Sequence, residues 1–118
     1  MQMHDENKLR EFADKYSRNA IVFVAEENKD VLGFIAFYAN NLVSRNAFIS
    51  SIVIRKQYQG KGVGSQLLGK AESYSKMCNM TSIALEVDRM NMKAVNLYKK
   101  KGYVFVDEKA NMMKKQII

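Results

Sequence analysis

The alternation of apolar and polar segments along the chain predicts six strands. Short runs rich in β-branched and aromatic residues, bounded by polar residues, are typical of strands. Two of them are separated only by the polar residues Glu27–Asp30, so we expect these two to form a hairpin. The six runs are Ala20–Glu26, Val31–Ala39, Ala47–Ile54, Thr81–Val87, Tyr103–Val106 and Met112–Ile118.

Three other segments carry apolar residues at intervals of three and four, which is the spacing of one helix face. Asn91, directly before the last of them, is a favourable N-terminal cap. Asn79 and Gly102 follow the second and third segments and are residue types that commonly end helices. The predicted helices are residues 3–17, 63–77 and 92–101.

The order of these elements predicts the fold class. A strand, the helix at 63–77 and another strand follow one another, which implies a right-handed crossover between parallel strands. We therefore expect a mixed sheet of about six strands with about three helices, in the α+β or α/β class. A chain of 118 residues suits a single domain, 1–118, with one core.

Composition narrows the class of protein. The contents of 47% hydrophobic and 26% charged residues are ordinary for a soluble globular domain. No apolar run approaches the ~18 residues of a membrane span, and the polar N-terminus does not resemble a secretory signal. A single cysteine is typical of a reducing compartment, so we expect a cytoplasmic protein that does not bind membranes.

The metal-binding and nucleophilic residue types are scarce. One histidine and one cysteine are too few for a usual zinc site, so no metal is expected. His4 and Cys78 could act as base and nucleophile. However, Cys78 lies on the apolar stripe of its predicted helix, which favours a position in the core.

A net charge of +7 indicates either an anionic partner or a lysine-rich surface exposed to solvent. A small basic nucleic-acid binder is one interpretation. The chain lacks the aromatic strand pattern of RNA-recognition domains, and nothing beyond charge supports nucleic-acid binding. An anionic cofactor is the interpretation that the next feature favours.

Three glycines lie where the strand at 47–54 gives way to the helix at 63–77. Glycine accepts positive φ and allows close approach, while the first turn of a helix offers unpaired N–H groups and a positive dipole end. Together these features predict an anion site, most naturally for phosphate. The spacing matches neither the nucleotide-binding P-loop nor the dinucleotide fingerprint, which has a glycine where Ser65 stands.

Two segments resemble the GNAT superfamily of acetyl-CoA-dependent N-acetyltransferases. The first, Gln59-x-x-Gly62-x-Gly64, is similar to its R/Q-x-x-G-x-G/A loop. The second is similar to the family signature of the next strand and helix. It reads Leu85-Glu86-Val87-x-x-x-Asn91-x-x-Ala94-x-x-Leu97-Tyr98-x-x-x-Gly102-Tyr103. The resemblance is close over residues 47–107.

The resemblance implies a binding site for acetyl-CoA between two splayed central parallel strands. The pantetheine arm would pair with the exposed backbone of Ile52, Val53 and Ile54. Asn91 matches an asparagine that often contacts this arm, and it serves equally well as a helix cap. The loop amides and the helix N-terminus would bind the pyrophosphate of coenzyme A. The residues implied for that role are Gln59, Gly60, Lys61, Gly62, Val63, Gly64 and Ser65.

The resemblance also implies two catalytic residues. Tyr98 matches the tyrosine that protonates the leaving thiolate, although a tyrosine on an apolar helix face also suits a core. Many members carry a carboxylate base on the third strand, where this chain has Ser50. Glu86 matches the glutamate that serves as base in members acetylating ribosomal-protein N-termini. Glu86 could instead form an ion pair, with the amine losing its proton to water.

The predicted function is transfer of acetyl from acetyl-CoA to an amine, which could be a small molecule, a protein N-terminus or a lysine. The alternative is a non-enzymatic module of the same fold that binds acyl-CoA. The family's usual first strand and first helix have no counterpart here, which would leave the acceptor pocket open or let a second subunit complete it. The strand at 20–26 would then be an exposed edge. A homodimer would cover that edge. The sequence does not identify the acceptor.

Overall fold

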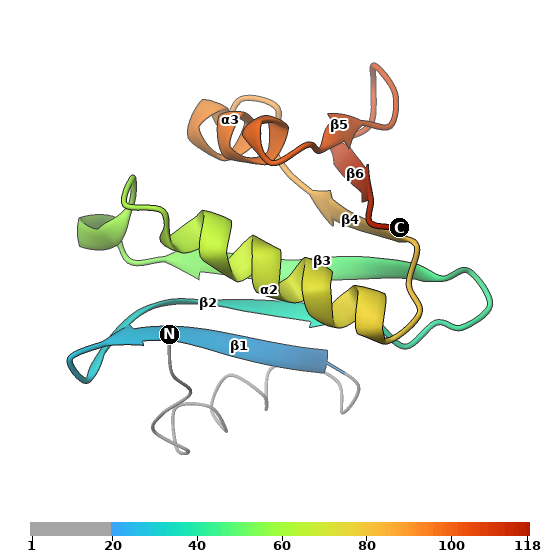
Figure 1. The fold of residues 1–118 in the computed structure, drawn as a ribbon. Coiled ribbons are helices and arrows are strands. Elements are labelled where there is room, and N and C mark those ends of the chain that lie inside the picture. Colours follow the sequence, from blue (N-terminus) through green and yellow to red (C-terminus); the bar gives the residue numbers. More distant parts are fainter. Residues whose placement is uncertain (1–19) are drawn as a thin grey trace.

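A mixed six-stranded sheet forms the centre of the structure, a computed structural model that describes residues 20–118 (Figure 1). The strands stand in the order β1-β2-β3-β4-β6-β5, and only β3 and β4 are parallel neighbours within this sheet. This confirms the predicted mixed sheet with a parallel central pair. The strands are β1 (Ala20–Glu27), β2 (Asp30–Tyr38), β3 (Asn46–Ile54), β4 (Ser82–Glu86), β5 (Val104–Phe105) and β6 (Met112–Gln116).

The hairpin of β1 and β2 closes through a two-residue turn. Asn28 and Lys29 have φ of 51° and 70°, and Glu27 pairs with Asp30. Two successive residues at positive φ give the turn a twist that matches the right-handed twist of the strands. The short polar segment between the two apolar runs is therefore the tight connection that the sequence predicts.

A bulge in β3 controls which side chains reach the core. Ala36 pairs with Ser51 and Phe37 pairs with Ile49, so Ser50 has no partner across the ladder. The Ser50 hydroxyl donates a hydrogen bond of 3.2 Å to the carbonyl of Ala36. The extra residue resets the alternation of the strand. As a result Ile49 lies in the core and Ile52 also packs against it.

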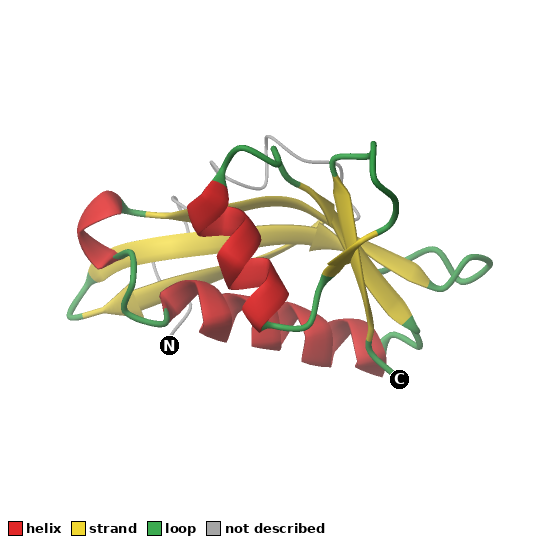
Figure 2. Cartoon of the chain, turned by 90° about the horizontal axis from the view of Figure 1, so that it is seen from above, coloured by secondary structure: helices red, strands yellow, loops and turns green. Residues whose placement is uncertain are grey.

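Two α-helices, α2 (Val63–Met77) and α3 (Met92–Lys100), pack against the same core. In Figure 2 the whole of α2 lies along one side of the long strands. The first turn of α2 touches α3 closely, because a Cβ atom built at Gly64 would lie 3.0 Å from Cδ2 of Leu97. A short 3-10 turn, η1 (Lys56–Tyr58), links β3 to the loop before α2.

Both helices end as predicted, at residues that adopt positive φ. Asn79 has φ of 68° after α2, and the amide of Met80 donates to the carbonyl of Ser75 at 2.9 Å. Gly102 has φ of 96° after α3, and the amide of Tyr103 donates to the carbonyl of Tyr98 at 2.9 Å. This bonding is the Schellman motif, which satisfies the last carbonyls of a helix.

The remaining differences from the predicted elements are small. Tyr103 belongs to the end of α3 because its amide is bonded there, so β5 is shorter than expected and begins at Val104. The last strand ends at Gln116 rather than at Ile118. The helix predicted at 3–17 lies outside the described residues. Within residues 20–118, neither α-helix has the length and apolar character needed to cross a bilayer.

Candidate active site

The loop between η1 and α2 is built on two glycines in the left-handed region. Gly60 has φ of 77° and Gly62 has φ of 86°. A Cβ atom built on either would meet nothing within 4 Å, so backbone conformation rather than packing requires glycine here. The space in front of these two residues is open, and Figure 1 shows the loop at the left-hand end of the molecule before α2.

The loop presents helix amides that have no internal partner. Gly62 is the N-cap of α2, and the first helical hydrogen bond runs from the amide of Gln66 to the carbonyl of Gly62 at 3.1 Å. The three preceding amides, of Val63, Gly64 and Ser65, therefore have no helical carbonyl to bind. No acidic residue lies in the first turn of α2. These donors and the helix dipole together suit a phosphate group.

Two side chains hold and flank this loop. The Gln59 amide nitrogen donates a 3.1 Å hydrogen bond to the carbonyl of Ile54, which fastens the loop to the end of β3. The Lys61 ammonium lies 5.8 Å from the centroid of the Tyr58 ring. Gln59 thus has a bracing role in the structure, whereas Lys61 adds a positive charge beside the open amides.

A gap opens between β3 and β4 next to the loop. The two strands pair only from Asn46 with Ser82 to Ile49 with Leu85. Beyond Ile49, β3 continues to Ile54 and pairs only with β2 among the described strands. The backbone edge of the segment Ile52–Ile54 that faces away from β2 is therefore not paired with a described strand and can hydrogen-bond an extended ligand, apart from the Ile54 carbonyl that Gln59 already occupies.

Asn91 and Tyr98 are both supplied by α3. The Asn91 side-chain oxygen accepts a 3.3 Å hydrogen bond from the amide of Ala94, as expected of an N-cap. Tyr98 is only 6% exposed, and burial raises the pKa of its hydroxyl. This hydroxyl has no hydrogen-bond partner among residues 20–118, and its ring meets that of Tyr103 edge-on at 6.0 Å. A tyrosine is protonated at neutral pH even without this rise, so the hydroxyl can donate a proton.

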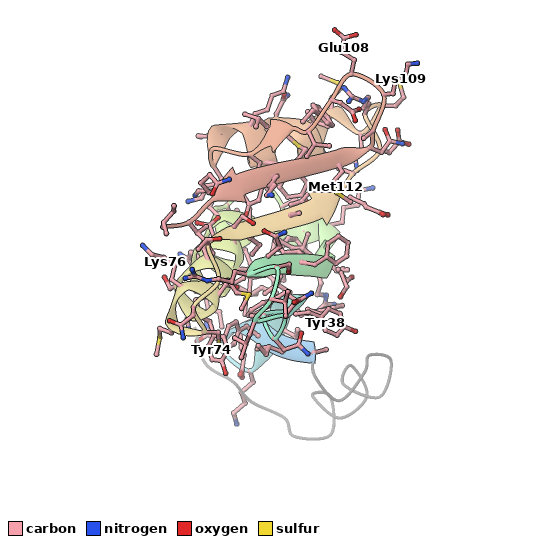
Figure 3. All side chains as sticks on the ribbon, turned by 90° about the vertical axis from the view of Figure 1, so that its right-hand side faces the viewer. Tyr38, Tyr74, Lys76, Glu108, Lys109 and Met112 are labelled. Carbon is pink, nitrogen blue, oxygen red and sulfur yellow. The ribbon has the colours of Figure 1, made fainter. Side chains whose placement is uncertain are left out.

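Glu86 lies at the end of β4 on the other face of the sheet. Its neighbours Leu85 and Val87 are buried in the core that contains Tyr98, whereas Glu86 itself is exposed. Since successive side chains of a strand point to opposite faces, Glu86 and Tyr98 approach the gap from opposite sides. Glu86 pairs across the sheet with Met112. In Figure 3, Tyr74 and Lys76 of α2 lie on one side of the sheet and Met112 on the other.

The structure also contains two polar clusters that the sequence motifs do not reveal. In one, Glu72 accepts hydrogen bonds from the Tyr103 hydroxyl at 2.9 Å and from Lys115 at 2.8 Å. In the other, Arg89 binds carbonyls of the loop between β5 and β6. Neither cluster has a spacing that would indicate it. Across the described part of the chain, no three His, Cys, Asp or Glu residues gather as metal ligands.

Comparison with known proteins identifies similar sequences among N-acetyltransferases. Spermidine N(1)-acetyltransferase of Escherichia coli K12 is 33% identical over 82 residues, covering 69% of this chain and 44% of the relative. N-alpha-acetyltransferase of Sulfurisphaera tokodaii is 32% identical over 94 residues, covering 71% of this chain and 56% of the relative. The chain thus spans about half the length of these relatives.

Solved structures share the fold. One is a GNAT family acetyltransferase from Elizabethkingia anophelis with acetyl-CoA bound, which has a TM-score of 0.75 and 17% identity. The likeness covers 91% of this chain and 82% of the other. The model of the acetyltransferase (GNAT) family matches residues 2–103. Since that match takes in most of the sequence, the chain belongs to the GNAT acetyltransferase family.

Proposed function

We propose that the protein transfers the acetyl group of acetyl-CoA directly to an amine. The observation that carries this proposal is the loop of open amides at the start of α2, directly beside the unpaired edge of β3. The loop amides offer hydrogen-bond donors to the pyrophosphate of coenzyme A. The edge of β3 offers backbone groups to its pantetheine arm, which carries amides. The two lie in the order in which these groups follow one another in coenzyme A.

The cofactor-binding residues follow from this arrangement. The amides of Gly60–Ser65 receive the pyrophosphate, and Lys61 adds a charge that draws the anion inward. The Gln59 side chain keeps the loop on the end of β3. The segment Ile52–Ile54 pairs with the pantetheine arm, and Asn91, at the start of α3, contacts the arm from across the gap.

The chemical step needs one proton donor and one proton acceptor. The nitrogen of the neutral amine bonds to the thioester carbonyl carbon, the carbon–sulfur bond breaks, and the sulfur leaves as a thiolate. Glu86 first takes a proton from the ammonium form of the acceptor, which makes the amine neutral. Tyr98 gives its hydroxyl proton to the leaving thiolate, and the proton that the nitrogen sheds on forming the amide passes to water. The position of these two side chains on opposite faces of the sheet fits the two roles, since the acceptor and the acetyl-CoA then approach from different sides.

A second candidate is a module that binds acyl-CoA without transferring the acyl group. Two observations favour it. Ser50, an unpaired bulge residue, stands where many family members carry a carboxylate base. Glu86, the remaining candidate, is exposed and has no hydrogen bond or ion pair among residues 20–118 that would orient it.

One experiment separates the two candidates. Acetyl-CoA is incubated with a panel of polyamines, lysine-containing peptides and peptides with free N-termini, and release of free thiol is followed with a colorimetric reagent. We expect thiol release that depends on both the amine and the protein. If acetyl-CoA raises the melting temperature but no amine yields thiol, the binding module is the function.

A further inference from the structure

Arg89 lies between β4 and α3, three residues after Glu86, and its side chain is bound to the loop between β5 and β6. Its Nε atom donates to the carbonyl of Ala110 at 3.2 Å. A terminal nitrogen donates to the same carbonyl at 2.7 Å and also to the carbonyl of Asp107. The guanidinium carbon lies 3.8 Å from the centroid of the Phe105 ring, which adds a cation–π contact.

The loop is shaped so that these carbonyls face Arg89. The Asp107 carboxylate accepts hydrogen bonds from the amides of Lys109 and Ala110, which folds residues 107–110 into a tight turn. These bonds, the one from Ala110 first, lower the pKa of Asp107. The loop thus has its own turn structure, and Arg89 connects it to the segment that leaves β4.

This connection depends on the shape of the guanidinium group. Arginine offers several N–H donors in a fixed planar fork, which can reach two carbonyls while the plane stacks on an aromatic ring. A lysine ammonium at the same position would keep the charge but could not reproduce both contacts. The requirement for arginine is therefore geometric rather than electrostatic.

The loop that Arg89 holds stands next to the candidate base. The amide of Val87 donates to the carbonyl of Asn111 at 2.9 Å, and Glu86 pairs with Met112, the first residue after the loop. Figure 3 shows Glu108 and Lys109 at the projecting tip of this loop, with Met112 nearer the sheet. Residues 107–111 therefore border the approach to Glu86.

We infer that Arg89 is a positioning residue that holds the loop 107–111 as one wall of the acceptor site. The inference rests on the proposed acetyl transfer. Loops held on a rigid scaffold commonly determine which ligand is accepted, and a displacement of about 1 Å in a reacting group can cost about a hundredfold in rate. The Arg89 guanidinium stacks on Phe105, which packs against the core on the Tyr98 face, so Arg89 reaches the acceptor only through the loop 107–111. Arg89 belongs neither to the loop 60–65 nor to the segment 52–54, so we expect acetyl-CoA binding to change little.

The test uses the full chain with Arg89→Ala and Arg89→Lys, and the best amine from the panel as acceptor. We expect both variants to raise KM for the amine by about tenfold or more, with KM for acetyl-CoA within about twofold of the parent. Added methylguanidinium should partly lower the raised KM of Arg89→Ala for the amine, because it can occupy the space that the Arg89 side chain leaves over Phe105. Hydrogen exchange at the amides of Lys109 and Ala110 should be faster in both variants.

Arg45→Ala is the matched control. The Arg45 side chain also donates to a backbone carbonyl, that of Asn79 at 2.8 Å, but it does so in the connection that precedes β3. Its loss should lower stability without changing KM for the amine. The inference is wrong if the Arg89 variants leave KM for the amine unchanged, if Arg45→Ala raises it equally, or if KM for acetyl-CoA rises in parallel. A parent protein that transfers acetyl to no amine refutes the proposed function itself, and with it an acceptor role for Arg89.

Discussion

At the scale of single residues, the two candidate catalytic groups are fixed to different degrees. Tyr98 is enclosed by the core and meets the ring of Tyr103, so its position is set by packing. Glu86 is exposed at the end of a strand, so its backbone is fixed by the pairing with Met112 while its side chain can move. A proton donor that must meet one sulfur atom benefits from a fixed position, whereas a base that meets varied acceptors tolerates movement.

Replacing Tyr98 with Phe should slow acetyl transfer by about 10²-fold or more, because the variant keeps the ring and loses only the donated proton. The thermal stabilisation by acetyl-CoA should stay as in the parent. Steady-state rates at saturating acetyl-CoA, with melting temperatures, give both quantities. Tyr103→Phe is the matched control, since it also removes one buried hydroxyl and should leave the rate nearly unchanged. A Tyr98→Phe protein that turns over like the parent would make Tyr98 a packing residue.

Replacing Glu86 with Gln should lower the rate most at neutral pH. The acceptor amine is mainly protonated there, since an alkylamine has a pKa of about 10. Raising the pH supplies neutral amine without a base, so part of the loss should be recovered. The measurement is a pH–rate profile of parent and variant from pH 7 to about pH 10. Parallel profiles would remove Glu86 from the mechanism and leave proton removal to water.

At the scale of elements, the loop before α2 combines two different uses of glycine. Gly60 and Gly62 are needed for positive φ and face open space, whereas Gly64 is needed because α3 packs against it. Gly69, in the middle of α2, has neither requirement, since a Cβ there meets nothing within 4 Å and its φ is not positive. The chain thus supplies its own control for a test of the loop.

Gly62→Val should abolish the rise in melting temperature that acetyl-CoA gives. A β-branched side chain at positive φ is strained by about 1–2 kcal/mol and would distort the amides that bind the pyrophosphate. Gly69→Ala should keep the full response and add up to about 1 kcal/mol of stability, as expected for a helix interior. Thermal unfolding with and without acetyl-CoA measures both. If acetyl-CoA raises the melting temperature of Gly62→Val as much as that of the parent, the loop only connects β3 to α2 and does not bind the cofactor.

The sequence predicts elements better than it predicts the geometry between them. Strand and helix positions follow from local periodicity and from end signals such as Asn79 and Gly102, and those predicted within residues 20–118 agree with the structure to within a few residues. The two motifs also locate the loop and the family. The bulge at Ser50 and the contacts of Arg89 arise from pairings between distant segments, and no local pattern encodes them. For the same reason the acceptor remains outside what the sequence can specify.

At the scale of the whole molecule, one polar cluster ties the C-terminal strands to the long helix. Glu72 of α2 accepts a hydrogen bond from the hydroxyl of Tyr103 and forms an ion pair with Lys115, a residue of β6. The Glu72 and Lys115 side chains are 13% and 25% exposed, so water screens this ion pair only in part. Burial, followed by the negative charge of Glu72 and the hydrogen bond to it, raises the pKa of Tyr103 well above its usual range.

Tyr103→Phe should lower the free energy of unfolding at pH 7 by about 1.5–3 kcal/mol, the usual value of a hydrogen bond to a charged group. The parent should lose stability as the pH rises past about 10, because the unfolded state then ionises Tyr103 while the folded state keeps it protonated. The Phe variant has no hydroxyl to ionise at position 103 and so does not lose stability in this way. The difference in unfolding free energy between parent and variant should therefore shrink at high pH. Urea unfolding at pH 7 and near pH 10.5 tests this, and a constant difference would contradict it.

The place of β6 in the sheet fixes the order in which the sheet can assemble. β6 follows β5 in the sequence but lies between β4 and β5, and β5 pairs with β6 alone in the described sheet. The two-residue strand β5 therefore has no edge to join until residues 112–116 are present, whether β6 is already on β4 or first forms a hairpin with β5. During synthesis, β1 to β3 can form their meander early, whereas β5 must wait for a strand that is translated after it. The acceptor-side loop, which connects β5 to β6, therefore cannot take its folded shape before both of these strands have been translated.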